Sequence, residues 1–140
     1  MKKSIVTIGV FDGVHIGHQA VIKKVIDRAK AIGAMSVVVT FDPHPLKVLG
    51  RGRLVPSLMS LKHRVDAIKG LGVDKVIVMK FDKRLSRVEP GDFINNIIRK
   101  KLNAREIFVG EDFCFGKGAG ADIKALKRIG GTDGLKVHSV

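Results

Sequence analysis

Two histidines three residues apart, His15 and His18, are the first candidates for chemistry in this sequence. They belong to the segment Gly9–His18, which reads GVFDGVHIGH and follows a strand-like apolar run. Backbone N–H groups at a helix N-terminus favour phosphate, and imidazoles beside them can donate hydrogen bonds to charge that develops on a phosphoryl group. Gly17 lets the backbone approach a ligand closely. The pattern predicts a phosphate-handling site with His15 and His18 as catalytic residues.

Two plainer interpretations compete with catalysis. The histidines could cap the helix, or they could bind zinc together with other ligands. Zinc needs at least three protein ligands, and the remaining candidates His44, His63 and Cys114 stand at spacings that match no common zinc site. We therefore favour catalysis and expect no metal ligands among the protein side chains.

Two further polar segments follow strand-like runs. Thr40–Pro45 reads TFDPHP, and Val109–Gly118 reads VGEDFCFGKG. The first could be only a proline-rich turn, and the second only a glycine-rich surface loop. Phenylalanines interleaved with glycines can instead offer a planar ring an apolar surface and N–H donors for its polar edge. Both segments are therefore candidates for ligand binding.

Short β-branched runs alternate with helical periodicity along the chain. The predicted strands span Ser4–Val10, Met35–Phe41, Asp74–Phe81, Arg105–Val109 and Leu135–Val140. The predicted helices span Gly17–Ile32, Leu58–Leu71, Glu89–Leu102 and Asp122–Ile129. This alternation indicates an α/β protein with a parallel sheet flanked by helices. Ligands bind such sheets beyond the carboxyl ends of the strands, so we expect the segments after the first, second and fourth strands to converge.

The composition limits the classes of protein. A chain of 140 residues, with 45% hydrophobic and 28% charged residues, is expected to form one folded domain. The net charge of +13 suggests a polyanionic ligand, but the absence of Trp and Tyr argues against nucleic acid. No apolar run has the length of a membrane helix, so no membrane partner is expected. The single cysteine, Cys114, favours a reducing, cytoplasmic location.

The HIGH tetrapeptide resembles the HxGH motif of the nucleotidylyltransferase superfamily, which has a Rossmann-like fold. The longer string GVFDGVHIGHQ is similar to the FMN adenylyltransferase module of bacterial bifunctional riboflavin kinase/FAD synthetases. TFDPHP and VGEDFCFGKG resemble the nucleotide and flavin segments of the same family, so the resemblance covers essentially residues 1–140. Val10 stands where that family usually has Asn.

The resemblance implies that ATP adenylylates FMN to give FAD and pyrophosphate, with Mg²⁺ accompanying ATP. The catalytic residues implied are His15 and His18. The nucleotide-binding residues implied are Gly9, Phe11, Asp12, His15, Gly17, His18, Pro43, His44 and Pro45. The flavin-binding residues implied are Gly110, Asp112, Phe113, Phe115 and Gly116.

Two elements of the family pattern do not occur in the 140 residues. One is an SSTxIR-like segment that helps to bind the ATP phosphates, and the other is the riboflavin kinase module. We therefore expect residues 1–140 to form an incomplete, C-terminally truncated FMN adenylyltransferase domain with weak or no turnover in isolation. Two alternatives stay open: a truncated or degenerate module that binds nucleotide or flavin without turnover, and another small-molecule nucleotidylyltransferase.

Overall fold

A parallel β-sheet forms the centre of the protein in the computed structural model, which describes residues 2–42, 60–110 and 123–140. The strands of these residues stand in the order β3-β2-β1-β4-β5, and every neighbouring pair is parallel. Their bounds are β1 Ser4–Ile8, β2 Met35–Asp42, β3 Lys75–Lys80, β4 Ala104–Val109 and β5 Lys136–Ser139. The predicted α/β architecture with a parallel sheet is thereby confirmed.

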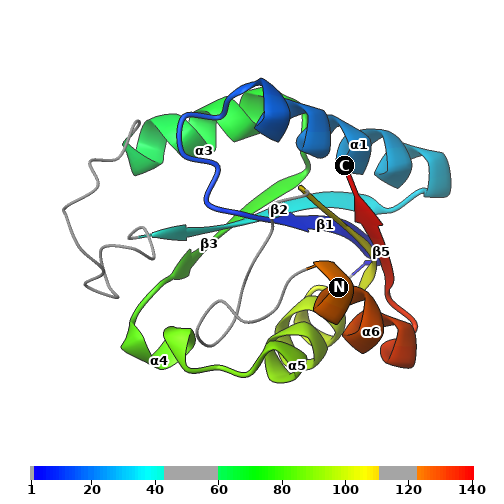
Figure 1. The fold of residues 1–140 in the computed structure, drawn as a ribbon. Helices are drawn as coiled ribbons and strands as arrows, with labels where there is room; N and C mark the ends of the chain where they lie inside the picture. The colour runs from blue at the N-terminus through cyan, green and yellow to red at the C-terminus, as the bar shows by residue number, and fades with distance from the viewer. Residues whose placement is uncertain (1, 43–59, 111–122) are drawn as a thin grey trace.

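Helices cover both faces of this sheet (Figure 1). One face carries α1 (Ile16–Ile32) and α3 (Leu61–Gly70). The other carries α4 (Lys83–Ser86), α5 (Pro90–Asp92), the π-helix η1 (Phe93–Lys101) and α6 (Ile123–Asp133). The helices thus flank the sheet as the sequence predicts, because parallel strands need crossover connections that return over a face.

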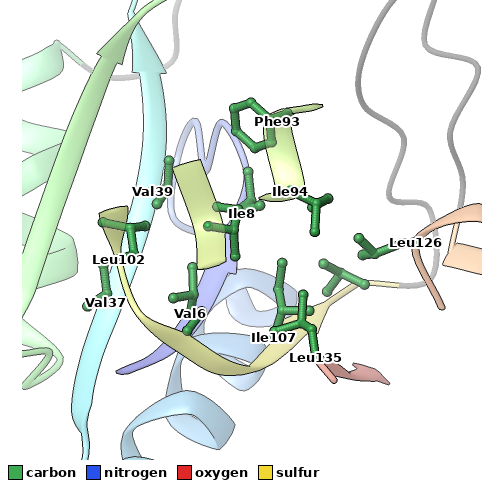
Figure 2. Packing of buried hydrophobic residues seen from close by; sticks show 13 residues of the cluster. Val6, Ile8, Val37, Val39, Phe93, Ile94, Leu102, Ile107, Leu126 and Leu135 are labelled. Atoms are coloured by element: carbon green, nitrogen blue, oxygen red, sulfur yellow. The ribbon is translucent and has the colours of Figure 1, made fainter. Parts of the chain in front are cut away.

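Side chains of the strands alternate between the two faces of the sheet and pack there in separate clusters. Val6 and Ile8 of β1 join Val37 and Val39 of β2 in a cluster that also contains Ile94 of η1, as Figure 2 shows. The intervening side chains face α1, where Ile5 of β1 packs in a cluster with Val21, Val25 and Ala29 of α1. Both faces of β1 are therefore buried, which explains why the strand contains no charged side chain.

The order of the strands reverses at β1. The chain runs from β1 through β2 to β3 on one side, then returns to form β4 and β5 on the other side. The crossovers beside β1 therefore lie on opposite faces, and a crevice is expected between the carboxyl ends of β1 and β4. This position receives the segment Gly9–His15 from β1 and Gly110 from β4.

Most of the predicted boundaries shift by a few residues, and three of the differences are larger or have a clear cause. β1 ends at Ile8 rather than Val10, because backbone φ angles of +55° at Phe11 and +84° at Gly13 turn the chain out of the strand. The segment predicted as one helix over Glu89–Leu102 is α5 followed by the π-helix η1, and α4 was not predicted. In η1 the N–H of Leu102 donates to the carbonyl of Ile97, five residues earlier.

The third difference concerns α6, which extends to Asp133 instead of ending near Ile129. Glycine often ends a helix, yet α6 continues through Gly130 and Gly131. Gly130 is used for a close approach instead, because a Cβ atom there would lie 2.9 Å from the carbonyl oxygen of Leu135.

Candidate active site

The loop between β1 and α1 has an unusual backbone. Phe11 and Val14 adopt positive φ angles of 55° and 43°, which non-glycine residues rarely do. Both side chains are buried, and the N–H of Val14 donates to the carbonyl of Phe11 at 3.1 Å. Such backbone persists only where its surroundings hold it, and it is common at functional sites.

Contacts from β2 and α1 hold this loop in place. The hydroxyl of Thr40 donates to the carbonyl of Val10 at 2.7 Å, and the side-chain amide of Gln19 donates to the carbonyl of Val14 at 3.0 Å. At the start of the loop, the N–H of Gly9 still donates to the carbonyl of Val39 in β2. The neighbouring strand and helix therefore define the path of the chain that leads to the histidines.

Phe11 folds back over Gly9. A Cβ atom at Gly9 would lie only 2.9 Å from Cζ of the Phe11 ring, so no larger residue fits without displacing that ring. Phe11 is only 6% exposed, and its ring makes a T-shaped contact with His18 at a centroid distance of 5.2 Å and an interplanar angle of 89°. Gly9 and Phe11 thus form a fixed apolar support for His18.

His15 is the N-cap of α1. Its Nδ1 accepts hydrogen bonds from the N–H groups of Gly17 at 3.1 Å and of His18 at 3.4 Å. A Cβ atom at Gly17 would lie 3.0 Å from Cε1 of His15, so glycine lets the ring approach closely. Because Nδ1 accepts, a neutral His15 carries its ring proton on Nε2. The capping interpretation is therefore correct for His15, and capping leaves Nε2–H to act as a donor.

His18 stacks on His15. The two ring centroids are 3.5 Å apart and the planes are inclined by 24°. Burial, and after it the positive charge that His15 can carry, holds the pKa of His18 below its ordinary value, while Asp12 acts in the opposite direction. Two stacked imidazolium ions would repel each other, so the arrangement favours a neutral His18.

A pocket of about 390 Å³ opens at the crevice between β1 and β4. Of the residues proposed from the sequence, it brings together Gly9, Phe11, His15, Gly17, His18 and Gly110. Asp12 belongs to the same loop but does not line the pocket. Gly110, the first residue after β4, thus lies beside the segment that follows β1, as expected. Pro43, His44, Pro45, Asp112, Phe113, Phe115 and Gly116 lie outside the described residues.

Sequence reasoning missed part of the pocket wall. Thr7, Ile8, Val10, Val21 and Val140 also line it. Four of these are apolar residues that read as ordinary core or strand positions. Thr7 is different, because it places a hydroxyl between apolar residues of β1, although strand propensity alone does not distinguish it from valine.

The pocket combines apolar walls with two imidazoles at the start of a helix, which suits a ligand that carries phosphate on an apolar ring system. In residues 2–42, 60–110 and 123–140, no three His, Cys, Asp or Glu side chains come close enough to hold a metal ion. None of the described helices has both the length and the apolar character that crossing a membrane requires.

Comparison with known proteins shows the family to which the chain belongs. The sequence profile of the FAD synthetase family matches residues 1–140. The chain belongs to the FAD synthetase family. The resemblance drawn from GVFDGVHIGHQ is thereby confirmed, since the match extends over residues 1–140.

Two bacterial proteins are similar to this chain over most of its length. The chain is 34% identical over 139 residues to a "Bifunctional riboflavin kinase/FMN adenylyltransferase" of Buchnera aphidicola subsp. Schizaphis graminum, covering 99% of this chain and 45% of that protein. It is 38% identical over 125 residues to a "Putative bifunctional riboflavin kinase/FMN adenylyltransferase" of Geobacillus thermodenitrificans, covering 89% and 67%. The chain thus spans less than half of the length of the first relative.

Solved structures share the fold. A structure titled "Macrolide-efflux Protein" from Streptococcus pneumoniae matches with a TM-score of 0.85 and 28% identity, over 99% of this chain and 44% of that one. A lipopolysaccharide core biosynthesis protein from Thermoplasma volcanium matches with a TM-score of 0.57 and 21% identity, over 100% and 95%. The second likeness concerns the fold alone.

Proposed function

We propose that this chain carries out FMN adenylyl transfer, in which ATP and FMN give FAD and pyrophosphate. The stacked pair His15 and His18 in the pocket between β1 and β4 carries the proposal. The family match over residues 1–140 and the relatives' names, which include FMN adenylyltransferase, support it.

In this reaction a phosphate oxygen of FMN attacks the α-phosphorus of ATP. A new P–O bond forms, the bond from the α-phosphorus to the oxygen that bridges to the β-phosphate breaks, and pyrophosphate leaves with that oxygen. Because negative charge redistributes over phosphoryl oxygens, catalysis depends on positioning and electrostatic stabilisation. No protein nucleophile takes part.

His15 and His18 are the proposed catalytic residues. Nε2–H of His15 is left as a donor because Nδ1 is held by the backbone of α1. His18 is a neutral donor beside it, and its lowered pKa keeps it uncharged. A neutral imidazole in a fixed place can stabilise developing oxyanion charge without having to lose a proton.

Two backbone N–H groups at the start of α1 are already occupied and are not open to a phosphate. The N–H groups of Gly17 and His18 already donate to Nδ1 of His15. A phosphate that used these two donors would have to displace the imidazole. We therefore propose that phosphate meets the His15 ring at Nε2, and that the backbone donors act through the ring by holding it in place.

The two substrates are proposed to enter from opposite sides of β1. β2 ends at Asp42, directly before the proposed nucleotide residues, and β4 ends at Val109, directly before the proposed flavin residues. The nucleotide side consists of Gly9, Phe11, Asp12, Pro43, His44 and Pro45. The flavin side consists of Gly110, Asp112, Phe113, Phe115 and Gly116. Strands β2 and β4 both pair with β1, which supports this arrangement.

Mg²⁺ is proposed to arrive with ATP. The described residues place no three acidic, histidine or cysteine side chains together, so they do not fit a dedicated metal centre. Mg²⁺ often keeps several waters and binds mainly through substrate phosphates, where it offsets their charge. This chain's residues would then contact the nucleotide rather than the ion.

Residues 1–140 are proposed to form part of an FMN adenylyltransferase domain. The relatives' names also contain riboflavin kinase, and we assign no step of that reaction to these residues. A riboflavin kinase module is therefore proposed as a companion of this domain in the family. The single cysteine, Cys114, supports the further proposal of a cytoplasmic location.

Incubation of the purified chain with FMN, ATP and Mg²⁺ tests the function, with FAD and pyrophosphate measured by chromatography and a coupled assay. We expect FAD to form above the background without protein, and to form slowly because the 140 residues contain no SSTxIR-like segment. Calorimetry with ATP and with FMN separately should show binding of both. Binding without any pyrophosphate release would support the non-catalytic module instead.

Substrate competition distinguishes the other alternative. Phosphopantetheine with ATP, and a phosphorylated acceptor with CTP, are offered in place of FMN with ATP. The proposal requires FMN to be the preferred acceptor. Faster pyrophosphate release with another acceptor would overturn it in favour of a different nucleotidylyltransferase.

A further inference from the structure

Thr7 places a hydroxyl where the fold does not need one. It lies in β1, is 0% exposed, and stands beside Val38 of β2 and Phe108 of β4 in the register of the sheet. Its Oγ1 has no hydrogen-bond partner. A valine would fill the same space without burying an unpaired polar atom, which costs free energy. The hydroxyl therefore calls for a role beyond packing.

A second unpartnered atom lies in the wall of the same pocket. Nδ1 of His18 is buried and accepts or donates no hydrogen bond. Two other buried side-chain atoms in the described part of the chain lack partners, Nε of Arg64 and Oδ1 of Asn95, and neither residue lines the pocket. The two unpartnered atoms of the pocket thus belong to Thr7 and to a proposed catalytic residue.

The fold places these two atoms on the same side of the sheet. Thr7 shares the face of β1 with Ile5, which packs against Val21 of α1. His18 precedes Val21 by three residues, so both lie on one side of α1. Thr7, His18 and Val21 all line the pocket. The first turn of α1 therefore holds His18 over the part of β1 that contains Thr7.

The chemistry of the two atoms is complementary, because a hydroxyl can donate and an unprotonated imidazole nitrogen can accept. We infer that Thr7 is a positioning residue for His18, whose Nδ1 accepts a hydrogen bond from the Thr7 hydroxyl when the His18 ring engages a phosphate. Hydrogen bonds in catalytic sites are commonly long without substrate and shorten in the complex. This bond keeps the ring proton on Nε2.

His15 provides an internal parallel. Its Nδ1 accepts from the backbone of α1, which leaves Nε2–H toward a ligand. With Thr7 bonded to Nδ1 of His18, both stacked imidazoles present Nε2–H as neutral donors. The catalytic consequence rests on the proposed adenylyl transfer, whereas the hydrogen bond itself requires only that a phosphate binds at His18.

Nitrogen NMR of the chain labelled with ¹⁵N-histidine tests this inference. Spectra of wild type, Thr7→Val and Thr7→Ser are compared with and without ATP and Mg²⁺, and the His18 signals are assigned with His18→Gln. In wild type we expect Nε2 to carry the proton and Nδ1 to show the upfield shift of an acceptor. Thr7→Val should lose that shift, and Thr7→Ser, which keeps a hydroxyl, should recover it.

Thr7→Val keeps the shape of the side chain, so the fold is expected to persist. His138, whose Nε2 contacts Oε1 of Glu106 at 2.7 Å in another part of the protein, provides a folding reference in the same spectra. Identical Nδ1 signals of His18 in wild type and Thr7→Val, in both samples, would overturn the inference. A proton found on Nδ1 of His18 in wild type would overturn it as well.

Kinetics separates positioning from packing. Thr7→Val should lower kcat for adenylyl transfer about tenfold and leave the KM for ATP within about twofold, because only the orientation of His18 changes. Thr7→Ser should restore most of kcat. If the NMR difference is present but no FAD forms with any variant, the proposed function fails while the Thr7–His18 bond stands.

Discussion

The imidazole of His18 contacts two rings: it stacks on His15 at a centroid distance of 3.5 Å and lies perpendicular to the ring of Phe11 at a centroid distance of 5.2 Å. These two ring contacts restrict the orientation of His18 before any ligand arrives. They also explain why the pKa of His18 is lowered, since both burial and a neighbouring imidazole disfavour a second positive charge. The site thus favours a neutral His18 whose ring has limited freedom to turn.

Replacing His18 by alanine should lower adenylyl transfer far more than it weakens FMN binding. Loss of a positioned hydrogen-bond donor to the developing charge typically costs on the order of 100- to 1,000-fold in kcat. The rate of FAD formation and the calorimetric affinity for FMN provide the two measurements. His63→Ala is a matched control, because His63 is an exposed histidine on α3 and should leave both values unchanged. An unaltered rate in His18→Ala would contradict the catalytic role.

Two substitutions of His15 should affect stability and activity differently. In His15→Ala the helix loses its side-chain cap, so the free energy of unfolding should fall by about 1 kcal/mol and the transfer rate should fall too. His15→Asn keeps a side chain that caps helices well but has no ring N–H for phosphate. Denaturant titration should therefore find His15→Asn close to wild type in stability, and the rate assay should find it as slow as His15→Ala. Equal activity of His15→Asn and wild type would mean that capping is the only role.

The architecture was predictable because β-branched runs and helical periodicity report burial directly. Once the strands alternate with helices, the rules for parallel sheets place a ligand crevice at their carboxyl ends, and Gly9–His18 with Gly110 lie there. Val10 misled the assignment of β1, since its side chain suits a strand while the backbone turns at Phe11. Positive φ at Phe11 and Val14 has no sequence signature, because non-glycine residues adopt it only under tertiary contacts.

The contribution of Thr7 and Val140 to the pocket was not predictable from spacing. A single threonine in an apolar strand satisfies strand propensity as well as valine does, so no periodicity distinguishes it. Val140 lines the pocket because its N–H donates to the carbonyl of Val109, which brings the end of the chain beside β4. Pairing between distant segments of this kind appears only when the strand order is known.

Gly9→Ala should destabilise the protein and slow the reaction. The added Cβ would lie 2.9 Å from Cζ of Phe11, so the ring must move and the support of His18 moves with it. We expect a loss of about 1–3 kcal/mol in the free energy of unfolding, as for overpacking in a core. Gly131→Ala is the matched control, because nothing lies within 4 Å of a Cβ there and the residue is inside α6. That variant should gain up to about 1 kcal/mol from helix propensity and keep its activity.

A buried carboxylate joins α1, β4 and β5 away from the pocket. Glu106, only 5% exposed, accepts hydrogen bonds from Nε of Arg28 at 2.9 Å and contacts Nε2 of His138 at 2.7 Å. Burial by itself would raise the pKa of Glu106, but the hydrogen bonds and positive charges of His138 and Arg28 outweigh it, and the pKa lies below its ordinary value. The ionised form is thus the one that the folded protein stabilises.

Stability should therefore depend on the charge of Glu106. A carboxyl whose pKa is lower in the folded state stabilises the fold fully above its unfolded pKa of about 4.3, and this contribution disappears as the pH falls through the folded pKa. Glu106→Gln should lose on the order of 1–3 kcal/mol of unfolding free energy at pH 7. The difference from wild type should shrink as the pH is lowered from about 5 toward 3. Urea titrations of both proteins across this range provide the measurement, and a difference that stays constant with pH would show that the charge of Glu106 does not stabilise the fold.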